Sequence, residues 1–364
     1  MSKITSIATA VPTYKHNQST LLNYAKKVFC NNELDARKLS FLYHQSGIGY
    51  RYSILPDFDE ALNNNQLFEN KNTIAYTPTI TKRMELFSKH AADISVNAIV
   101  ECINDKITTN QITHLITVSC TGMSAPGLDL QIMEALKLPK NMVRTSVNFM
   151  GCYAAIHALK IADAFCNNDT KANVIVVCTE FCTLHFQSQP TVDNLTASLL
   201  FADGCAAVLI QHNNISKGLQ IENFYSHVNF DGKKDMSWSL SENGFLMTLS
   251  GYVPELIKAD FNVLVASALA KTNRTKEDVT HWCVHPGGKK IVDNIALSLA
   301  IDKANFAQSY QVLHDYGNMS SPTIIFVLQK ILQIVKNNST QKDVVFAAAF
   351  GPGLTMETFT ATYA

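Results

Sequence analysis

The segment Ile112-Thr-His-Leu-Ile-Thr-Val-Ser-Cys-Thr-Gly122 is the most informative stretch of the chain, because a weaker copy of it occurs at Val279-Thr-His-Trp-Cys-Val-His-Pro-Gly-Gly288. Each segment is a short apolar run that ends in small residues, as expected of a buried strand followed by a turn. Both begin with an aliphatic residue and a Thr-His pair. The two segments are therefore candidates for equivalent strands in two halves of the molecule.

Two further pairs of landmarks follow these segments in the same order. Gly151 opens an apolar helical pattern in the first half, and Gly317 opens one in the second half at nearly the same spacing. A strand-like run from Asn173 is then matched by a run from Asp343. Three matched landmarks in one order predict two copies of one β/α unit, which is far longer than a solenoid repeat. Chance similarity between two α/β segments is the alternative.

Apolar periodicity elsewhere alternates between short β-rich runs and longer helical stretches. We expect strands at Ile112–Ser119, Val143–Asn148, Val174–Thr179, Ala206–Gln211, Val279–Val284 and Val344–Phe350. We expect helices at Ser88–Cys102, Leu128–Leu136, Tyr153–Phe165, Glu255–Ala270, Lys289–Ala300 and Pro322–Val335. Surface loops are expected at the Asn-rich segments Asn63–Asn65, Asn167–Asn168, Asn213–Asn214 and Asn337–Asn338. Strands this apolar need cover on both faces, which predicts an α/β fold built in layers.

The composition of the 364-residue chain excludes two classes of protein. Lys and Arg together number 30, as do Asp and Glu, so the formal net charge is zero. This balance lacks the basic excess that binding to a phosphate backbone requires, and we expect no nucleic-acid partner. Polar residues interrupt every apolar run before it reaches the roughly 18 residues of a spanning helix, so we expect no membrane span.

The cysteines and the N-terminus indicate the compartment. Nine cysteines form an odd set that is spread through apolar runs, which is typical of a reduced, intracellular protein. The first residues, from Met1 to Pro12, contain one cation and a strand-like alternation, without the charged head and apolar core of a signal peptide. We therefore expect a cytoplasmic protein.

Cys152 is the best candidate nucleophile. It lies between the expected strand Val143–Asn148 and a strong helical pattern, in Asn148-Phe-Met-Gly-Cys-Tyr-Ala-Ala. A strand-turn-helix placement exposes the side chain at the turn, and the free N–H groups of the helix start stabilise a thiolate. The alternative is an unreactive core thiol, because free cysteine is among the most buried residue types.

His285 and Asn318 are candidate partners for this thiol. His285 ends an expected strand in Trp282-Cys-Val-His-Pro-Gly-Gly288, so its imidazole points into the crevice where α/β folds bind ligands. Asn318 lies in Asp315-Tyr-Gly-Asn-Met-Ser-Ser-Pro322 and, if the duplication is real, occupies a helix start equivalent to that of Cys152. The alternative for Asn318 is a helix N-cap.

Other motifs are weaker signals. Phe346-Ala-Ala-Ala-Phe-Gly-Pro-Gly-Leu-Thr355 predicts a strand that runs into a rigid turn. The sequence contains neither the phosphate-cradling Gly-x-x-x-x-Gly-Lys-Ser/Thr motif nor the dinucleotide motif Gly-x-Gly-x-x-Gly. Cys178 and Cys182 have a spacing that could ligate a metal, but no second ligand pair accompanies them, so we expect no metal site.

Several motifs match one family in order and spacing. They are Gly151-Cys152, Val177-Cys-Thr-Glu180, Phe201-Ala-Asp-Gly-Cys-Ala-Ala207, His285-Pro-Gly-Gly288, Gly317-Asn318-Met-Ser-Ser321 and Phe350-Gly-Pro-Gly-Leu-Thr355. From about Ile4 to its end, the chain thereby resembles the type III polyketide synthases, the chalcone synthase-like family. The resemblance implies an α/β, thiolase-like fold, in which two similar βαβαβαββ halves, here 1–212 and 213–364, form a five-layered αβαβα arrangement. It also implies a homodimer.

The resemblance implies the catalytic roles as well. Cys152 would accept an acyl group from a CoA thioester, His285 would be its base partner, and His285 and Asn318 would form the oxyanion hole. An acyl-enzyme divides the synthesis into two easier steps. Decarboxylation of malonyl-CoA leaves an enolate. Neutral hydrogen-bond donors in a dry pocket can stabilise the oxygen of this enolate. The expected activity is decarboxylative Claisen condensation of an acyl starter with malonyl-CoA, with CoA thioesters as substrates and no cofactor.

The residues that the resemblance implies for the substrate pocket are Phe201, Met247, Trp238, His185, Cys182, Glu180, Cys120, Thr121, Ser320, Pro352, Gly287, Gly288 and Arg51. Phe201 matches one gatekeeping phenylalanine, and the more adaptable Met247 replaces the second. His185 and Trp238 replace small residues, while Cys182, Cys120 and Ala125 replace Thr, Thr and Met. We expect the bulk of His185 and Trp238 to exclude aromatic starters, which favours an aliphatic starter and a pyrone- or resorcinol-type product.

The CoA-binding cations of the family have no clear match in this sequence. Their positions fall near Gln45 and Gly49, with only Arg51 close by. An acyl carrier protein is therefore an alternative donor of the starter.

Four other classes of protein are alternatives. A ketoacyl synthase III-like enzyme shares the fold and a Cys-His-Asn set, but Gln-Ala-Asn typically follows its histidine, where this chain has Pro286-Gly-Gly. A thiolase would need a second cysteine in the C-terminal glycine-rich loop, and Phe350–Gly353 has none. A papain-like protease would need a Cys-Gly-Ser-Cys-Trp context, which is missing. A catalytically silent partner subunit is disfavoured because the Cys-His-Asn set is retained.

Overall fold

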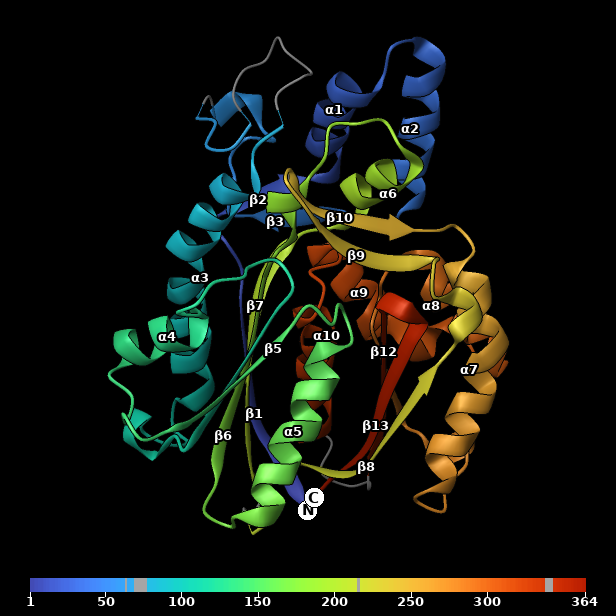
Figure 1. Ribbon diagram of the computed structural model, residues 1–364. Coiled ribbons are helices and arrows are strands. Elements are labelled where there is room, and N and C mark those ends of the chain that lie inside the picture. The colour runs from blue at the N-terminus through green and yellow to red at the C-terminus, as the bar shows by residue number, and fades with distance from the viewer. Residues whose placement is uncertain (63, 69–76, 215–216, 338–342) are drawn as a thin grey trace.

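A nine-stranded mixed sheet runs through the described part of the molecule, which comprises residues 1–62, 64–68, 77–214, 217–337 and 343–364 of a computed structural model. Its strand order is β11-β12-β13-β8-β1-β7-β6-β4-β5, and Figure 1 labels most of these strands. The first half of the chain contributes β1 (Ser2–Ala10), β4 (His114–Ser119), β5 (Val143–Asn148), β6 (Asn173–Phe181) and β7 (Asp203–His212). The second half contributes β8 (Leu219–Val228), β11 (His281–Val284), β12 (Val344–Gly351) and β13 (Thr355–Tyr363). Strands β1 and β8 pair antiparallel and join the two halves.

The strand pairing confirms the internal duplication. In the first half, β4 is parallel to β6, β6 is antiparallel to β7, and β7 is antiparallel to β1. In the second half, β11, β12, β13 and β8 repeat these relations in turn. The halves differ at the third strand, because the 3-10 helix η6 (Lys303–Phe306) and the helix α9 (Ala307–Tyr316) stand in the chain where the second half would have its copy of β5. The second half therefore departs from the expected βαβαβαββ pattern at that point.

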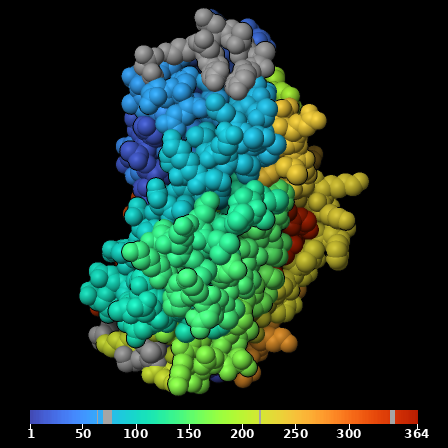
Figure 2. All heavy atoms as spheres, turned by 60° about the vertical axis from the view of Figure 1, so that its left-hand side comes forward, coloured from blue at the N-terminus to red at the C-terminus, as the bar shows by residue number. Residues whose placement is uncertain are grey.

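Helices complete five layers, as the expected αβαβα arrangement requires. Helices α5 (Ala154–Asn168) and α10 (Pro322–Asn337) form the central layer, and their apolar faces share one core with both halves of the sheet (Figure 1). Helices α3 (Ile80–Ile103) and α4 (Leu128–Leu136) pack outside the first half, on the face that Figure 2 brings forward in cyan and green. Helices α7 (Val253–Ala270) and α8 (Lys289–Leu299) pack outside the second half.

The remaining elements gather at the end of the sheet that lies away from the two termini (Figure 1). They are β2 (Tyr14–Asn17), α1 (Gln18–Phe29), α2 (Glu33–Gln45), β3 (Tyr50–Ser53), α6 (Val192–Leu200), β9 (Met236–Ser241), β10 (Gly244–Leu249) and α9 (Ala307–Tyr316). Strands β9 and β10 form a hairpin, whereas β2 and β3, which α1 and α2 separate in the chain, pair antiparallel in another two-stranded sheet. Short 3-10 helices cover Glu60–Leu62, Thr109–Gln111, Cys182–His185 (η3), Phe230–Gly232, Lys276–Asp278 and Pro352–Leu354.

The expected elements differ from the observed ones mainly at their ends. Helix α3 begins at Ile80, eight residues before the expected Ser88, because the side chain of Thr79 caps it by accepting from the N–H of Lys82. Asn167 and Asn168 end α5, and Asn337 ends α10, so these asparagines are helical. Asn63 and Asn338 lie outside the described residues. No helix of the described residues is long and apolar enough to cross a membrane.

Candidate active site

One cavity brings together the three residues that the sequence singled out. Cys152, His285 and Asn318 all line it, although they come from the turn before α5, the end of β11 and the segment before α10. The other lining residues are Cys120, Thr121, Gly151, Cys182, Phe201, Met236, Ser237, Trp238, Met247, Leu249, Gly287, Ile291, Ser320, Phe350 and Pro352. The duplicated fold thus places the first turns of α5 and α10 at one site.

Only glycine can occupy the position before Cys152. Gly151 has a φ of 80°, and a Cβ atom at this position would lie 2.2 Å from Cδ of Pro352. The Gly-Cys motif and the Gly-Pro-Gly turn therefore pack directly against each other. This contact holds the turn that presents the thiol of Cys152 to the cavity.

The thiol of Cys152 is half-buried and neutral in this structure. Burial raises its pKa to about 12, and the charge of Glu180 also raises it, whereas hydrogen bonds with Ser320 and Asn318 lower it. Because the first effect dominates, the thiolate that we expected at neutral pH does not form in the resting site. A thiolate requires that the proton be transferred to a neighbouring base.

His285 is the base that faces this cavity. Its side chain is buried, and neither ring nitrogen has a hydrogen-bond partner among the described residues. Burial lowers the pKa of the imidazole to about 3, so the ring is neutral. Its backbone N–H donates to Ala348 O at 2.9 Å, which fixes the end of β11 against β12. An imidazole that is buried without a partner and lines a cavity is free to bond a substrate atom.

Asn318 has both a structural and a chemical role. Its backbone N–H donates to Leu200 O at 2.9 Å, and its side-chain oxygen accepts from the N–H of Ser320 at 2.9 Å. This local bond resembles the helix N-cap that we considered as the alternative role of Asn318. The side-chain nitrogen donates a long bond, 3.3 Å, to Gly287 O, and the side chain also hydrogen-bonds the thiol of Cys152. The amide of Asn318 therefore lies beside the nucleophile, where it can donate to a substrate oxygen.

Glu180 lies behind the cavity and holds its wall. One carboxylate oxygen accepts from the N–H of Cys120 at 2.9 Å and from the hydroxyl of Thr121 at 2.8 Å. The other accepts from the hydroxyl of Ser321 at 2.8 Å. Burial nevertheless raises the pKa of this carboxyl to about 7. Glu180 thus joins the end of β4 to the start of α10.

We expect Glu180→Gln to change how stability depends on pH. Between 4.5, the ordinary pKa of the group, and about 7, folded wild type keeps a proton that the unfolded chain has lost, so its stability falls as pH rises. The shift corresponds to about 3 kcal/mol at pH 8. Glutamine accepts from Cys120 and Thr121 and donates to Ser321 without this cost. Melting temperatures from pH 5 to 8 should therefore show wild type losing stability relative to Glu180→Gln, and parallel curves would contradict this.

The structure brings most of the expected pocket residues to the catalytic cavity. Phe201, Met247, Trp238, Cys182, Cys120, Thr121, Ser320, Pro352 and Gly287 line it. Trp238 and Met247 face each other across the β9–β10 hairpin, and the indole N–H of Trp238 donates to Cys120 O at 2.8 Å. The hairpin therefore forms one wall of the cavity.

Four expected residues do not line this cavity: Glu180, His185, Gly288 and Arg51. The ring of His185 is held away from it because Nε2 bonds Thr121 O at 2.9 Å and Nδ1 accepts from the N–H of Phe245. Arg51 is buried and donates to Gln18 Oε1 at 3.0 Å and Phe201 O at 2.7 Å. The guanidinium of Arg51 is therefore hydrogen-bonded inside the protein, and its contact with CoA phosphates stays a prediction.

The sequence did not single out six of the lining residues as site residues: Gly151, Met236, Ser237, Leu249, Ile291 and Phe350. Phe350 directly precedes the Gly-Pro-Gly motif, and this motif was the sequence signal that pointed to its position. Met236, Ser237 and Leu249 belong to the β9–β10 hairpin, whose place over the site depends on packing with distant segments. Groups of metal-ligating side chains are absent from the described residues, and all nine cysteines are free.

Comparisons with known proteins agree over nearly the whole chain. The family model for the N-terminal domain of chalcone and stilbene synthases matches residues 1–214, and that for the C-terminal domain matches residues 225–362. A Mycobacterium tuberculosis protein, alpha-pyrone synthesis polyketide synthase-like Pks18, is 29% identical over 97% of this chain and 89% of its own length. A Dictyostelium discoideum protein named as a polyketide synthase is 28% identical over 98% of this chain, which spans only 11% of that protein.

A solved structure shows the same arrangement. The crystal structure of PKS-I from the brown alga Ectocarpus siliculosus superposes with a TM-score of 0.94 and 26% identity, covering 100% of this chain and 98% of that one. The thiolase-like fold expected from the sequence is therefore confirmed.

Proposed function

Because this chain belongs to the chalcone and stilbene synthase family and is a type III polyketide synthase, we propose that it condenses an acyl-thioester starter with malonyl-CoA at the cavity of Cys152. The observation that supports this most strongly is the convergence of Cys152, His285 and Asn318 on one cavity, where neither ring nitrogen of His285 has a partner in the described part of the chain. The site has a nucleophile, a base and two neutral donors, which are the groups that the reaction needs.

Acyl transfer is the first step of this proposal. His285 takes the proton of Cys152 as the sulfur attacks the thioester carbonyl, and the bond from that carbonyl to the CoA sulfur breaks. The proton then passes from His285 to the leaving CoA thiolate. Because both groups are neutral in the resting site, the ion pair forms only when a substrate is in place.

Condensation is the second step. The bond between the malonyl carboxylate and its methylene carbon breaks, CO₂ leaves, and the electron pair forms an enolate. The N–H groups of His285 and Asn318 donate to the enolate oxygen, which removes the need for a charged group in a buried site. The enolate carbon then attacks the acyl carbonyl on Cys152, and the Cys152 sulfur leaves with the electron pair. Further rounds and ring closure give a pyrone- or resorcinol-type product.

We further propose that the starter is an aliphatic acyl group. Trp238 lines the catalytic cavity, where its bulk restricts a rigid aromatic starter, whereas the flexible side chain of Met247 opposite it can move for an acyl chain. His185, which we expected to contribute, lies behind Trp238 at a ring distance of 5.7 Å and supports it from that side. Incubation with malonyl-CoA and a panel of acyl-CoAs, followed by mass analysis of the products, tests this assignment.

We expect Trp238→Gly to lengthen the product or admit an aromatic starter, because it removes the indole from the wall. Overfilling a packed pocket costs about 1–3 kcal/mol, which is roughly 5- to 150-fold in selectivity between starters. The matched control is Trp238→Phe, which loses the bond to Cys120 O but keeps most of the bulk. Steady-state kcat/KM for hexanoyl-CoA and coumaroyl-CoA is the measurement. A wild type that already prefers coumaroyl-CoA would overturn the aliphatic assignment.

A carrier-protein donor, as in a ketoacyl synthase III-like enzyme, is the second candidate. It is favoured by the burial of Arg51, the cation nearest to the positions where the family binds CoA phosphates. Comparing kcat/KM for one acyl group on CoA and on an acyl carrier protein distinguishes the two donors. A catalytically silent subunit would turn over neither. We also propose that the protein forms a homodimer, as its family resemblance implies, and that it is cytoplasmic, as its cysteine pattern indicates.

A further inference from the structure

The turn that carries Cys152 has a strained backbone. We call this segment, residues 149–152, the nucleophile turn. Phe149 has a φ of 62° and Gly151 has one of 80°, both in the left-handed region. This conformation is unfavourable for a phenylalanine, and a strained turn persists only where its surroundings hold it in place. The position of the Cys152 thiol therefore depends on the contacts that hold this turn.

The residues at the end of β4 provide two of these contacts. The backbone N–H of Phe149 donates to Ser119 O at 3.2 Å, and the N–H of Gly151 donates to Sγ of Cys120 at 3.0 Å. Cys120 is buried, and burial raises the pKa of its thiol well above its ordinary value. The thiol is therefore neutral, and its sulfur serves the nucleophile turn as a hydrogen-bond acceptor.

The backbone of Cys120 is fixed by two other walls of the site. Its N–H donates to the carboxylate of Glu180 at 2.9 Å, and its carbonyl oxygen accepts from the indole N–H of Trp238 at 2.8 Å. Only one torsion angle lies between this fixed backbone and the sulfur, which leaves the sulfur few staggered positions. Cys120 thus joins β6, the β9–β10 hairpin and the nucleophile turn through three different polar atoms.

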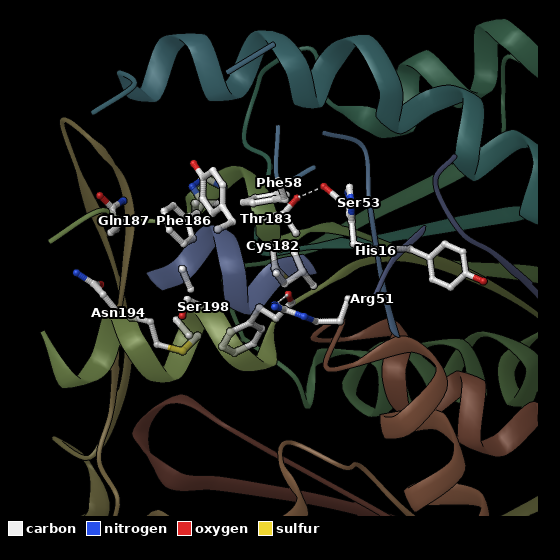
Figure 3. A pocket seen from close by; sticks show the side chains of 18 of the residues that line it. His16, Arg51, Ser53, Phe58, Cys182, Thr183, Phe186, Gln187, Asn194 and Ser198 are labelled. Atoms are coloured by element: carbon white, nitrogen blue, oxygen red, sulfur yellow. Dashed lines mark hydrogen bonds between the residues drawn. The ribbon is translucent and has the colours of Figure 1, made fainter. Parts of the chain in front are cut away.

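Cys182, another thiol of the catalytic cavity, has a different setting. It lines a neighbouring cavity as well, where it lies with Thr183 among the side chains shown in Figure 3. Burial is the main cause that raises the pKa of its thiol, and its sulfur has no hydrogen-bond partner among the described residues. Of these two thiols, only that of Cys120 is bonded to the nucleophile turn.

We propose that Cys120 is a positioning residue for the condensation, because its sulfur holds the nucleophile turn and thereby keeps the Cys152 thiol in line with His285 and the substrate carbonyl. This rests on the proposed function, in which Cys152 attacks the thioester. Cys120 itself forms no bond to the substrate in this account. The property that the position supplies is an acceptor atom next to the N–H of Gly151, which a hydroxyl on the same carbon also has.

Cys120→Ala tests the proposal, because it removes the acceptor and leaves the N–H of Gly151 without its partner. In a single turnover with saturating hexanoyl-CoA, the rate of Cys152 acylation should fall by about 10- to 100-fold, since a misplacement of about 1 Å costs about 10²-fold. The half-saturating concentration should stay close to that of wild type, because alanine adds no bulk to the cavity. Cys120→Ser should restore most of the rate.

The matched control is Cys205→Ala. Cys205 is also a buried thiol with a hydrogen bond, to the hydroxyl of Thr179 at 3.2 Å, but it lines neither of the two cavities. Both alanine variants lose a buried hydrogen bond and should melt at a lower temperature, whereas only Cys120→Ala should acylate slowly. An unchanged rate in Cys120→Ala, an equal loss of rate in Cys205→Ala, or a Cys120→Ser variant as slow as Cys120→Ala would each overturn the proposal.

A second reagent separates this proposal from the proposed function. If hexanoyl-CoA does not acylate wild type, the alkylation of Cys152 by iodoacetamide at pH 8 is followed on the same variants by peptide mass spectrometry. A displaced turn loses the hydrogen bonds with Ser320 and Asn318 that lower the pKa of Cys152. Alkylation should therefore be several-fold slower in Cys120→Ala than in wild type or Cys120→Ser. Equal alkylation rates would overturn the positioning role independently of the condensation.

Discussion

Cys152→Ala is expected to lower condensation below detection while the enzyme still decarboxylates malonyl-CoA. The reason is that the acyl group has no other place to be held, whereas loss of CO₂ requires only donors to the enolate oxygen, which His285 and Asn318 supply. Product formation and CO₂ release, measured on the same variant, separate the two steps. The small change in side chain, in a half-buried turn, should leave the melting temperature close to that of wild type.

The neighbouring thiols provide the control for this experiment. Cys120 and Cys182 line the same cavity, and burial raises the pKa of all three thiols, but at Cys152 hydrogen bonds with the side chains of Ser320 and Asn318 offset part of this rise. Cys120→Ser and Cys182→Ser should therefore still take the acyl adduct on Cys152. Condensation that survives in Cys152→Ala, or that disappears only when Cys120 or Cys182 is removed, would assign the nucleophile elsewhere.

Asn318→Asp is expected to lower the rate of malonyl-CoA decarboxylation by about 10²–10³ or more, since the loss of one oxyanion donor costs about that factor. Aspartate keeps the oxygen that accepts from the N–H of Ser320, so the local cap is preserved. It replaces the donor N–H group with a carboxylate that repels the enolate. Decarboxylation kinetics and melting temperature, measured together, distinguish a chemical role from a structural one.

Asn318→Ala is the companion variant. It loses the bond to Ser320 as well as the donor, and loss of such a cap costs about 1 kcal/mol. The melting temperature of this variant should therefore fall slightly. Undiminished decarboxylation in Asn318→Asp, together with a lower melting temperature in Asn318→Ala, would show that Asn318 only caps the chain before α10.

The core of the fold could be predicted from the sequence because it is duplicated. The matched segments from Ile112 and Val279 form β4 and β11, which hold equivalent places in the two halves. The loss of the third strand in the second half could not be predicted, since the four residues of Lys303–Phe306 are too few to show a strand or helix period. The α1, α2 and α6 layer was missed because its packing partners are distant in the chain.

The catalytic part of the site could be predicted better than its walls. The turn at Cys152 has a local signal, because Gly151 cannot be replaced by another residue. The strand end at His285 also has one, the Pro-Gly-Gly segment that follows it. The position of His185 depends instead on two hydrogen bonds, to Thr121 and Phe245, that connect segments about 60 residues away on either side. The cavity wall at Trp238 and Met247 likewise depends on the register of the β9–β10 hairpin.

Mass spectrometry of the acylated enzyme tests the central claim most directly. The protein is mixed with an aliphatic acyl-CoA, one sample is quenched and digested, and a second receives ¹³C-labelled malonyl-CoA before the quench. The peptide that contains Cys152 should carry the acyl group in the first sample and should lose it, or carry labelled extended chains, in the second. An adduct on another cysteine, or an adduct on Cys152 that malonyl-CoA neither extends nor removes, would contradict a condensing enzyme with Cys152 as its nucleophile.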